Sequence, residues 1–348
     1  MSITEKAVTG WLKAAAENRV LDMHREMSTL TLRIAGNTLL GTDVSADQEA
    51  VAQALNATQR EFDHYIARLI HAPRWIPGTI GWQGHRAQKE LQRIVQGIIE
   101  RRRREPSTQP NLLSLMMAAR DEESGQGLSD QELADEVLTF LLAGHETTAN
   151  ALTWTLLLLS QNPVCQRRLR EEAQRVLPVA TCEHRHLQGL AYTECVIKES
   201  MRLYPPAWII ERGTEKDAVL GGHRIPKGTM VLVSPYVTHR HPGFWSNPEG
   251  FDPERFSPER SASYDRYQYI PFGGGPRVCI GSVFAMMEAQ IILALSAKYL
   301  QFDLLPGHKV NLDPLVTLRP REGLPMRVHS TPTTVNPKSA HSISFDLT

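Results

Sequence analysis

The sequence predicts an α+β protein that is mainly α-helical, with a smaller β-rich part. Two observations lead to this fold class. Through the first half of the chain, apolar residues recur at spacings of three and four, which is typical of amphipathic helices. Between residues 218 and 237 the pattern changes to short apolar runs separated by Gly-Gly and Pro-Lys-Gly, which indicates strands joined by tight turns.

The longest helix is expected in the middle of the sequence. Ser129 and Glu132 have the spacing of a capping box, which marks its start. The helical pattern then continues without a Gly-Pro interruption to Gln161, where Asn162-Pro163 ends it. Such a helix has roughly 32 residues and a length of about 48 Å. It should therefore cross a whole domain.

The remaining elements are expected on both sides of this helix. Residues 241–270 are rich in proline and aromatic residues and show little periodicity, so a long irregular segment is expected there. A β-hairpin is expected near residues 310–329, and residues 331–348 are expected to be a disordered tail. No repeat or linker divides residues 1–330, which are predicted to form a single domain. Helices are predicted at residues 22–41, 47–71, 83–104, 164–176, 192–203 and 281–300.

The composition excludes several classes of partner. The 348 residues are 41% hydrophobic and 22% charged with a net charge of zero, so nothing favours nucleic acid or an anionic membrane. The four cysteines are too scattered for a disulfide framework or a zinc site, so a reducing, cytoplasmic location is expected. The N-terminal residues have no apolar run and are neither a signal peptide nor an anchor. Residues 137–159 are long enough for a membrane span, but His145 and Glu146 at their centre make a buried helix the better interpretation.

Residues 269–281, YIPFGGGPRVCIG, place a single cysteine in a glycine-rich loop. The glycines allow the backbone to approach a flat ligand closely. A Cys279 thiolate at the start of the following helix would be stabilised by backbone N–H groups, which would also tune the potential of a bound metal. Arg277 has the right chemistry to bind an acidic group of the ligand. The alternative is an inert buried cysteine in a turn.

This stretch resembles the haem-binding signature of the cytochrome P-450 family, Phe-x-x-Gly-x-Arg-x-Cys-x-Gly, at every specified position. The matching residues are Phe272, Gly275, Arg277, Cys279 and Gly281. A chance match at one given place has a probability of the order of 10⁻⁶ to 10⁻⁷. The resemblance implies that Cys279 is the axial thiolate ligand of a haem b iron and that Arg277 binds a carboxylate of the haem. It also implies the cytochrome P-450 fold, here without its first helices and first β-strands.

Residues 143–148, AGHETT, resemble the oxygen-activation stretch of the same family's long central helix. The resemblance makes Glu146 and Thr147 the acid–alcohol pair, and Gly144 the position where the helix can open beside the haem. Cleaving the O–O bond of O2 requires protons, and a hydroxyl backed by a carboxylate can relay them from water. His145 is expected to be a structural helix residue, because the cysteine already provides the axial ligand.

Three further residues match the family's buried ion-pair motif. Glu199 and Arg202 are three residues apart in KESMRLYPP, so they share a helix face and can pair. Arg255 lies in the Pro-Glu-Arg-Phe stretch, and in the family its counterpart joins this pair. We assign the trio to folding and haem retention. Arg212 matches a position where many members place a second propionate-binding arginine; the alternative is a surface arginine at a strand start.

Two segments match parts of the family that usually line the substrate pocket, namely residues 207–210 and 315–317. Both are apolar apart from Thr317, which is consistent with a hydrophobic substrate. His239 and His241 are expected to be loop residues, since they have no metal-ligand spacing. The candidate pocket residues are Phe140, Ala143, Ala207, Ile209, Ile210, Val316 and Thr317.

The resemblance implies an oxidoreductase, a haem-thiolate monooxygenase. It would insert one oxygen atom of O2 into a C–H bond of a terpenoid-, fatty-acid- or polyketide-like molecule. No flavin or iron–sulfur domain is encoded, so a ferredoxin or flavoprotein reductase is the expected electron donor. A haem protein that isomerises substrates or uses peroxide is a second reading, against which the intact Glu146–Thr147 pair argues. A non-catalytic helical fragment without cofactor is a third.

The resemblance extends from about residue 5 to residue 329, and Met1 falls at what looks like the middle of the family's fourth helical region. The part before it would include a Trp/Arg-bearing helix that contacts the other haem propionate, and a loop that closes one wall of the pocket. The chain is then either a shortened product or gene model of an intact monooxygenase, or a natural fragment. Weakened haem retention is the corresponding expectation for this chain.

Overall fold

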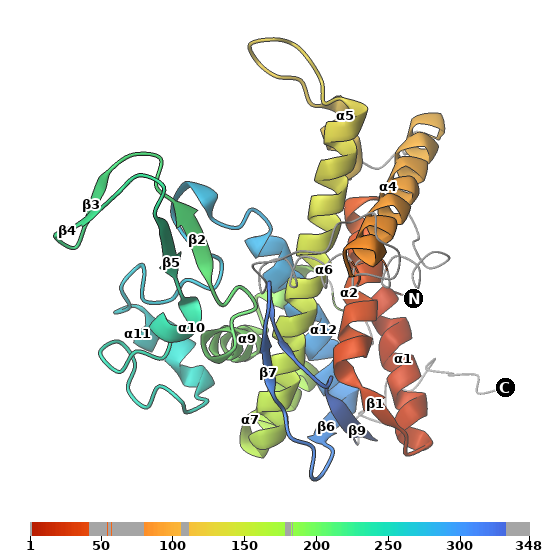
Figure 1. Ribbon diagram of the computed structural model, residues 1–348. Coiled ribbons are helices and arrows are strands. Elements are labelled where there is room, and N and C mark those ends of the chain that lie inside the picture. The colour runs from red at the N-terminus through yellow and green to blue at the C-terminus, as the bar shows by residue number, and fades with distance from the viewer. Residues whose placement is uncertain are drawn as a thin grey trace.

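The computed structural model describes residues 2–41, 80–105, 111–177 and 184–331, together with positions 54, 57 and 182. Helix α6 (Asp130–Gln161) runs through the whole molecule, and most other helices pack around it (Figure 1). Short strands form separate small sheets at its sides rather than one large sheet. The described residues are therefore mainly helical with a minor β part, as the sequence predicts.

The start and end of α6 follow from local sequence. The Ser129 hydroxyl accepts the N–H of Glu132, and the Glu132 carboxylate accepts the N–H of Ser129, so the predicted capping box is formed. At the other end, the Asn162 side chain donates to the carbonyl of Leu158, and Pro163 begins the next helix. The observed length of 32 residues confirms the predicted one.

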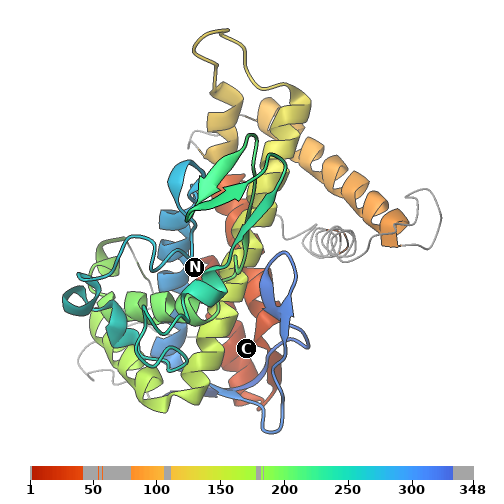
Figure 2. The same cartoon turned by 60° about the vertical axis from the view of Figure 1, so that its left-hand side comes forward.

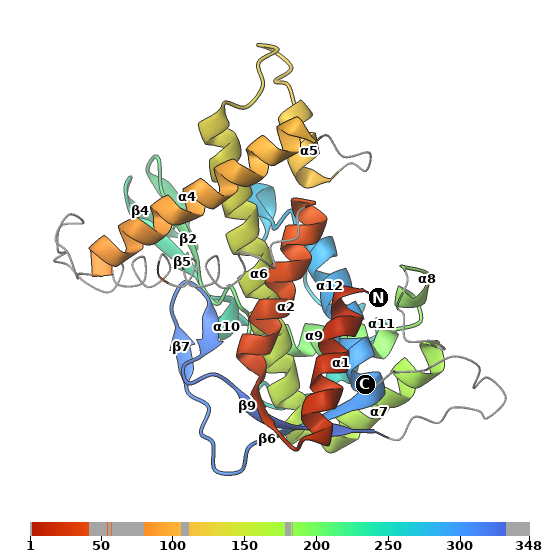
Figure 3. The same cartoon turned by 90° about the vertical axis from the view of Figure 1, so that its right-hand side faces the viewer.

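Two groups of apolar side chains fill the interior, and α6 contributes to both. Its second half is buried on all sides, against α2, α7, α9, α12 and strand β6 (Leu300–Leu304). Its first half packs against α4, which crosses it steeply, and against α5 (Figures 2 and 3). The other α-helices are α1 (Ile3–Ala16), α2 (Met23–Leu39), α4 (Ile80–Arg104), α5 (Leu112–Ala118), α7 (Pro163–Val176), α8 (His184–Leu187), α9 (Ala191–Leu203), α10 (Pro235–Thr238), α11 (Pro258–Ser261) and α12 (Ser282–Tyr299), and the 3-10 turns are η1 (Pro253–Phe256) and η2 (Gly275–Arg277).

The sheets are antiparallel and small. The first joins the two ends of the described chain: β1 (Val20–Asp22) pairs with β9 (Pro325–Ser330), which also pairs with β6 (Leu300–Leu304). Three two-stranded pairs complete the β part. They are β2 (Ile210–Gly213) with β5 (Met230–Val233), β3 (Ala218–Leu220) with β4 (His223–Ile225), and β7 (Leu312–Pro314) with β8 (Leu318–Pro320).

Most predicted elements within the described residues are present, with small shifts of their ends. The helix predicted at residues 83–104 begins at Ile80, and the one predicted at 281–300 ends at Tyr299, because Leu300 begins a strand. The strands β1 and β6 were not predicted, and β2 corresponds to the strand that the alternative interpretation of Arg212 assumed. The helix predicted at residues 47–71 and the tail from residue 332 lie outside the described residues. Within the described part of the chain, no helix, α6 included, is long and apolar enough to cross a membrane.

Candidate active site

Cys279 ends a tight loop directly before α12. Its backbone N–H donates to the carbonyl of Phe272 at 2.9 Å and closes the loop. Inside the loop, Gly273 and Gly275 have φ angles of 74° and 73°, in the left-handed region that favours glycine. A Cβ added to Gly275 would meet nothing within 4 Å, so its backbone conformation, rather than lack of space, requires glycine there.

The surroundings of Cys279 fit a flat apolar ligand. The thiol is exposed, and so are the apolar side chains of Val278, Ile280 and Val283, at 53%, 86% and 72%. Exposed apolar side chains gathered around one polar group are unusual on a protein surface and indicate a binding site. Helix α12 starts three residues after the cysteine, at Ser282. A thiolate-ligated haem is consistent with this donor and its apolar rim.

The other loop residues occupy distinct positions. Phe272 is half-buried and packs against the main apolar cluster, so it anchors the loop. Arg277 is exposed in η2, and Gly281 is the residue that caps α12. Ile210 at the start of β2 lies 3.7 Å from the position of a Cβ on Gly273, which brings β2 against the loop. Arg212 is exposed two residues further along β2, and its guanidinium donates to the carbonyl of Glu211 at 2.7 Å.

The middle of α6 lies beside the segment that leads into α12 (Figures 1 and 3). There Ala143 is exposed, and the Thr147 hydroxyl donates to its carbonyl at 2.8 Å. The helix is unbroken at Gly144, where the family resemblance implies an opening beside the haem. His145 faces the interior, and burial lowers the pKa of its ring, so it belongs to the packing of the helix.

The Glu146 carboxylate is bound by a residue from the other end of the chain. The Thr317 hydroxyl, in the turn between β7 and β8, donates to Glu146 Oε1 at 2.6 Å. Thr317 in turn accepts a hydrogen bond of 3.1 Å from the side-chain amide of Asn150. The Asn150 carbonyl oxygen lies 3.0 Å from Nε2 of His24 on α2. The structure thus joins the candidate acid to a candidate pocket residue, through contacts that sequence reasoning missed.

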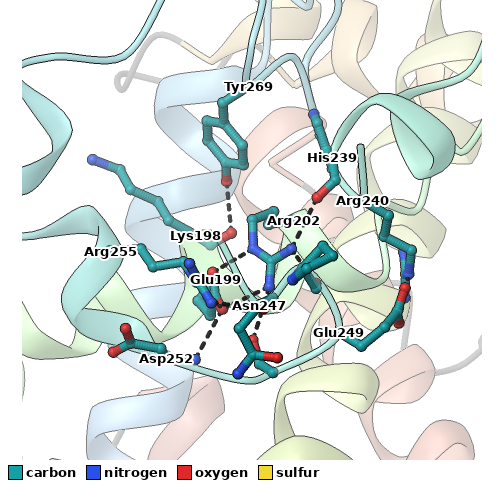
Figure 4. Close-up of polar contacts among 12 residues, drawn as sticks. Lys198, Glu199, Arg202, His239, Arg240, Asn247, Glu249, Asp252, Arg255 and Tyr269 are labelled. Atoms are coloured by element: carbon teal, nitrogen blue, oxygen red, sulfur yellow. Dashed lines mark hydrogen bonds and ion pairs between the residues drawn. The ribbon is translucent and has the colours of Figure 1, made fainter. Parts of the chain in front are cut away.

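Glu199, Arg202 and Arg255 form a buried ion cluster (Figure 4). Arg202 binds the Glu199 carboxylate through two hydrogen bonds of 2.7 and 2.8 Å, and Arg255 binds it at 3.2 Å. Burial raises the pKa of the Glu199 carboxyl, and the two guanidinium groups act in the opposite direction. Removing one member of such a cluster leaves an uncompensated buried charge, which costs about 3–5 kcal/mol.

This ion cluster is connected to the cysteine loop. Arg202 also donates to the backbone carbonyl of His239 at 2.9 Å, and the His239 ring accepts the N–H of Ile270 at 2.8 Å. Burial lowers the pKa of His239 to about 3, so the ring is neutral and its nitrogen can accept. Beside it, the Tyr269 hydroxyl donates to the carbonyl of Lys198 on α9 at 2.9 Å (Figure 4). The segment before the loop is therefore fixed from two sides.

The two candidate pocket segments are in contact. The Trp208 indole N–H donates to the carbonyl of Leu315 at 2.7 Å, which joins residues 207–210 to residues 315–317. Val316 is 43% exposed, while Thr317 is buried. Phe140 on α6 is half-buried, as are Ala207 and Ile209. Among the residues that the structure describes, no group of three or more His, Cys, Asp or Glu side chains could hold a metal ion.

Comparisons with known proteins agree with this arrangement. The sequence model of the family "Cytochrome P450" matches residues 2–323. "Cyclooctatin synthase" of Streptomyces melanosporofaciens is 36% identical over 90% of this chain and 68% of its own length. "Pentalenene oxygenase" of Streptomyces avermitilis is 34% identical over 87% of this chain and 66% of its own length. The chain thus spans about two thirds of the length of these relatives.

Solved structures give the same result. "Retinoic acid bound cyanobacterial CYP120A1" superposes with a TM-score of 0.82 at 28% identity, covering 94% of this chain and 73% of its own. A crystal structure of another cytochrome P450, CYP102L1, gives a TM-score of 0.85 at 27% identity, covering 95% of this chain and 76% of its own.

Proposed function

The chain belongs to the cytochrome P450 family of haem b monooxygenases that use O2, and from this premise we propose that it oxygenates a C–H bond of a terpenoid-like molecule. The observation that carries the proposal is the exposed Cys279 in its glycine-bent loop beside the middle of α6. The terpenoid class is supported by relatives that carry the names cyclooctatin synthase, cyclooctat-9-en-7-ol 5-monooxygenase and pentalenene oxygenase.

Cys279 is the proposed ligand of the haem iron. When bound, haem supplies the activation of O2, and a thiolate ligand favours cleavage of the O–O bond. Arg277 and Arg212 are the proposed partners of the haem carboxylates, since guanidinium groups bind carboxylates strongly. Phe272, Gly275 and Gly281 shape and anchor the loop, and Gly144 is the proposed position at which α6 can open beside the haem.

Glu146 and Thr147 are the proposed proton donors. Protons must reach O2 for its O–O bond to break, and a hydroxyl backed by a carboxylate can pass them from water. The Thr147 hydroxyl donates to the Ala143 carbonyl in this structure, so it must rotate away from that carbonyl before it donates elsewhere. Glu199, Arg202 and Arg255 are proposed to act on folding and haem retention, because they fix the segment that precedes the cysteine loop.

The substrate is proposed to lie against Phe140, Ala143, the 207–210 segment and Val316. These side chains are apolar, which suits a hydrocarbon-like molecule. We propose a ferredoxin or flavoprotein reductase as the donor of the two electrons that O2 requires. We also propose a cytoplasmic location, since the four scattered cysteines of the sequence suit a reducing compartment. We also propose that residues 1–330 form one domain, since α6 contributes to both apolar clusters.

The proposal is tested by product analysis under ¹⁸O2. The haem-loaded protein is combined with a ferredoxin, its reductase and NADPH, and is offered pentalenene, geranylgeraniol and lauric acid. The expected result is a product with one labelled oxygen atom from a terpenoid and less from lauric acid. A preference for lauric acid would overturn the terpenoid class. A haem-loaded protein that forms no labelled product from any compound would contradict the monooxygenase role.

A further inference from the structure

Asn150 is an unusual residue for its position. It is fully buried on α6, within the run ANALTWTLLLL that forms the centre of the apolar core. It lies four residues after Glu146, so both side chains project from the same face of the helix. Burying an amide costs free energy unless both of its polar ends find partners. The structure provides both partners.

These partners come from elements far apart in the sequence. His24 on α2 lies 3.0 Å from the amide oxygen, and the amide nitrogen donates to the Thr317 hydroxyl at 3.1 Å. Thr317 then donates to the Glu146 carboxylate at 2.6 Å, a distance typical of a hydrogen bond to a charged acceptor. The chain of contacts therefore runs from α2 through α6 to the β7–β8 turn and back to α6.

The three hydrogen bonds from His24 to Glu146 can be assigned donors and acceptors that agree with one another. Burial lowers the pKa of His24, so its ring is neutral at pH 7 and has one N–H to give. If that N–H is on Nε2, it donates to the Asn150 oxygen, which fixes the orientation of the amide. The amide N–H then occupies a lone pair of the Thr317 oxygen. The single hydroxyl hydrogen of Thr317 is thereby directed at Glu146.

We propose that Asn150, held by His24, is a positioning residue that orients the Glu146 carboxylate through Thr317. The proposal rests on the proposed role of Glu146 as the acid of the proton-delivering pair. A side-chain amide neither gains nor loses a proton at neutral pH. The chain of contacts through Asn150 therefore fixes the geometry of the site and does not conduct protons. Its effect is to hold Oε1 of the carboxylate in one position relative to α6.

The test compares two oxidants in Asn150→Leu, which keeps the size of the side chain and removes both hydrogen bonds. Hydrogen peroxide already carries the two electrons and two protons that O2 must acquire. Turnover with peroxide therefore needs no net protons from water, only the transfer of a proton from one peroxide oxygen to the other, whereas turnover with O2 and NADPH needs two protons from water. The probe is whichever of pentalenene, geranylgeraniol and lauric acid gives the largest spin-state shift. In Asn150→Leu, the ratio of O2-driven to peroxide-driven product should fall about tenfold relative to the unchanged chain. This is less than the 10²- to 10⁴-fold that acid–base catalysis contributes as a whole, because the variant disturbs the position of the acid without removing it.

The matched control is Thr153→Val. Thr153 is also fully buried on α6, but its hydroxyl donates only to the carbonyl of Ala149 in its own helix, at 2.7 Å. Thr153→Val should leave the ratio unchanged. The effect of Asn150→Leu should also vanish in a Glu146→Gln background. Equal losses with both oxidants would mean that Asn150 is only structural. If Asn150→Leu does not take up haem, His24→Phe replaces it and should give the same change in ratio.

A second measurement is independent of turnover and of the substrate. In protein labelled with ¹⁵N-histidine, reduced and bound to carbon monoxide so that it is diamagnetic, His24 should carry its proton on Nε2. That N–H signal should shift in Asn150→Leu and stay in place in Thr153→Val. A proton on Nδ1 instead, or no response to Asn150→Leu, would overturn the proposed contacts. This result is obtained even if the chain forms no product, so it separates failure of the positioning proposal from failure of the monooxygenase proposal.

Discussion

Replacing Glu288 by glutamine should change how the stability of the fold depends on pH. Glu288 lies on α12, is 6% exposed, and its Oε1 has no hydrogen-bond partner among the described residues. Burial raises the pKa of this carboxyl from its usual 4.5 to about 8. The folded chain therefore keeps a proton over a pH range in which the unfolded chain releases it.

The sign and size follow from this difference. A group that binds a proton more tightly in the folded state contributes stability that is complete below pH 4.5 and is lost as the pH rises through about 8. At about 1.4 kcal/mol per pH unit, the loss is about 3 kcal/mol at pH 7 and about 5 kcal/mol well above pH 8. Glu288→Gln has nearly the same shape and no proton to lose, so it should escape this loss.

The assay is unfolding by urea, followed by circular dichroism, between pH 5 and 9. The difference in unfolding free energy between Glu288→Gln and the unchanged chain should be small at pH 5 and should grow with pH in favour of the variant. Glu171→Gln, which removes an exposed carboxylate on α7, is the control and should show no such trend. Parallel pH curves for Glu288→Gln and the unchanged chain would refute the reasoning, because they would mean that Glu288 ionises without penalty in the fold.

Three other predictions concern the cluster, the loop and the acid–alcohol pair. Arg202→Leu should lower the unfolding free energy by about 3–5 kcal/mol, because it leaves the Glu199 carboxylate buried without its main partner. The unfolding free energy is measured by urea titration, and a loss well below this range would contradict the prediction. Arg260→Leu, at an exposed ion pair, should cost no more than about 1 kcal/mol in the same titration. Gly275→Ala should cost about 1–2 kcal/mol through its positive φ, while Gly10→Ala in α1 should stabilise by about 0.5–1 kcal/mol; equal effects would contradict the conformational argument. Thr147→Val should lower product formed per electron consumed about a hundredfold with O2, and normal coupling in this variant would remove Thr147 from the proton path.

The elements that the sequence predicted best are those whose signals are local. The ends of α6 depend on Ser129, Glu132 and the Asn162-Pro163 pair, all within a few residues of the boundary that they set. The strands between residues 218 and 233 were predicted because their turns are marked by glycine and proline. The cysteine loop was found for the same reason, since its fixed residues lie within ten positions of one another.

What the sequence did not predict depends on distant partners. β1 has three residues, and only its pairing with β9, some three hundred residues later, makes it a strand. The contact between Thr317 and Glu146 joins residues 171 positions apart, so no local sequence pattern predicts it. His239 has no metal-ligand spacing in the sequence and was expected to be a loop residue. In the structure its ring is buried and accepts a hydrogen bond from the N–H of Ile270. A local signal that remained unused was Asn150, an amide within the apolar run ANALTWTLLLL of α6.

The absorption spectrum of the reduced, carbon-monoxide-bound protein tests most directly whether Cys279 binds the haem iron. After loading with haem, the unchanged chain should show the red-shifted Soret band that thiolate ligation gives, and Cys279→Ser should lose it. Cys195→Ser, which removes a half-buried thiol that donates to the carbonyl of Phe256 at 3.3 Å, should keep the band. A red-shifted band that survives in Cys279→Ser, or haem bound to the unchanged chain without that band, would contradict the assignment.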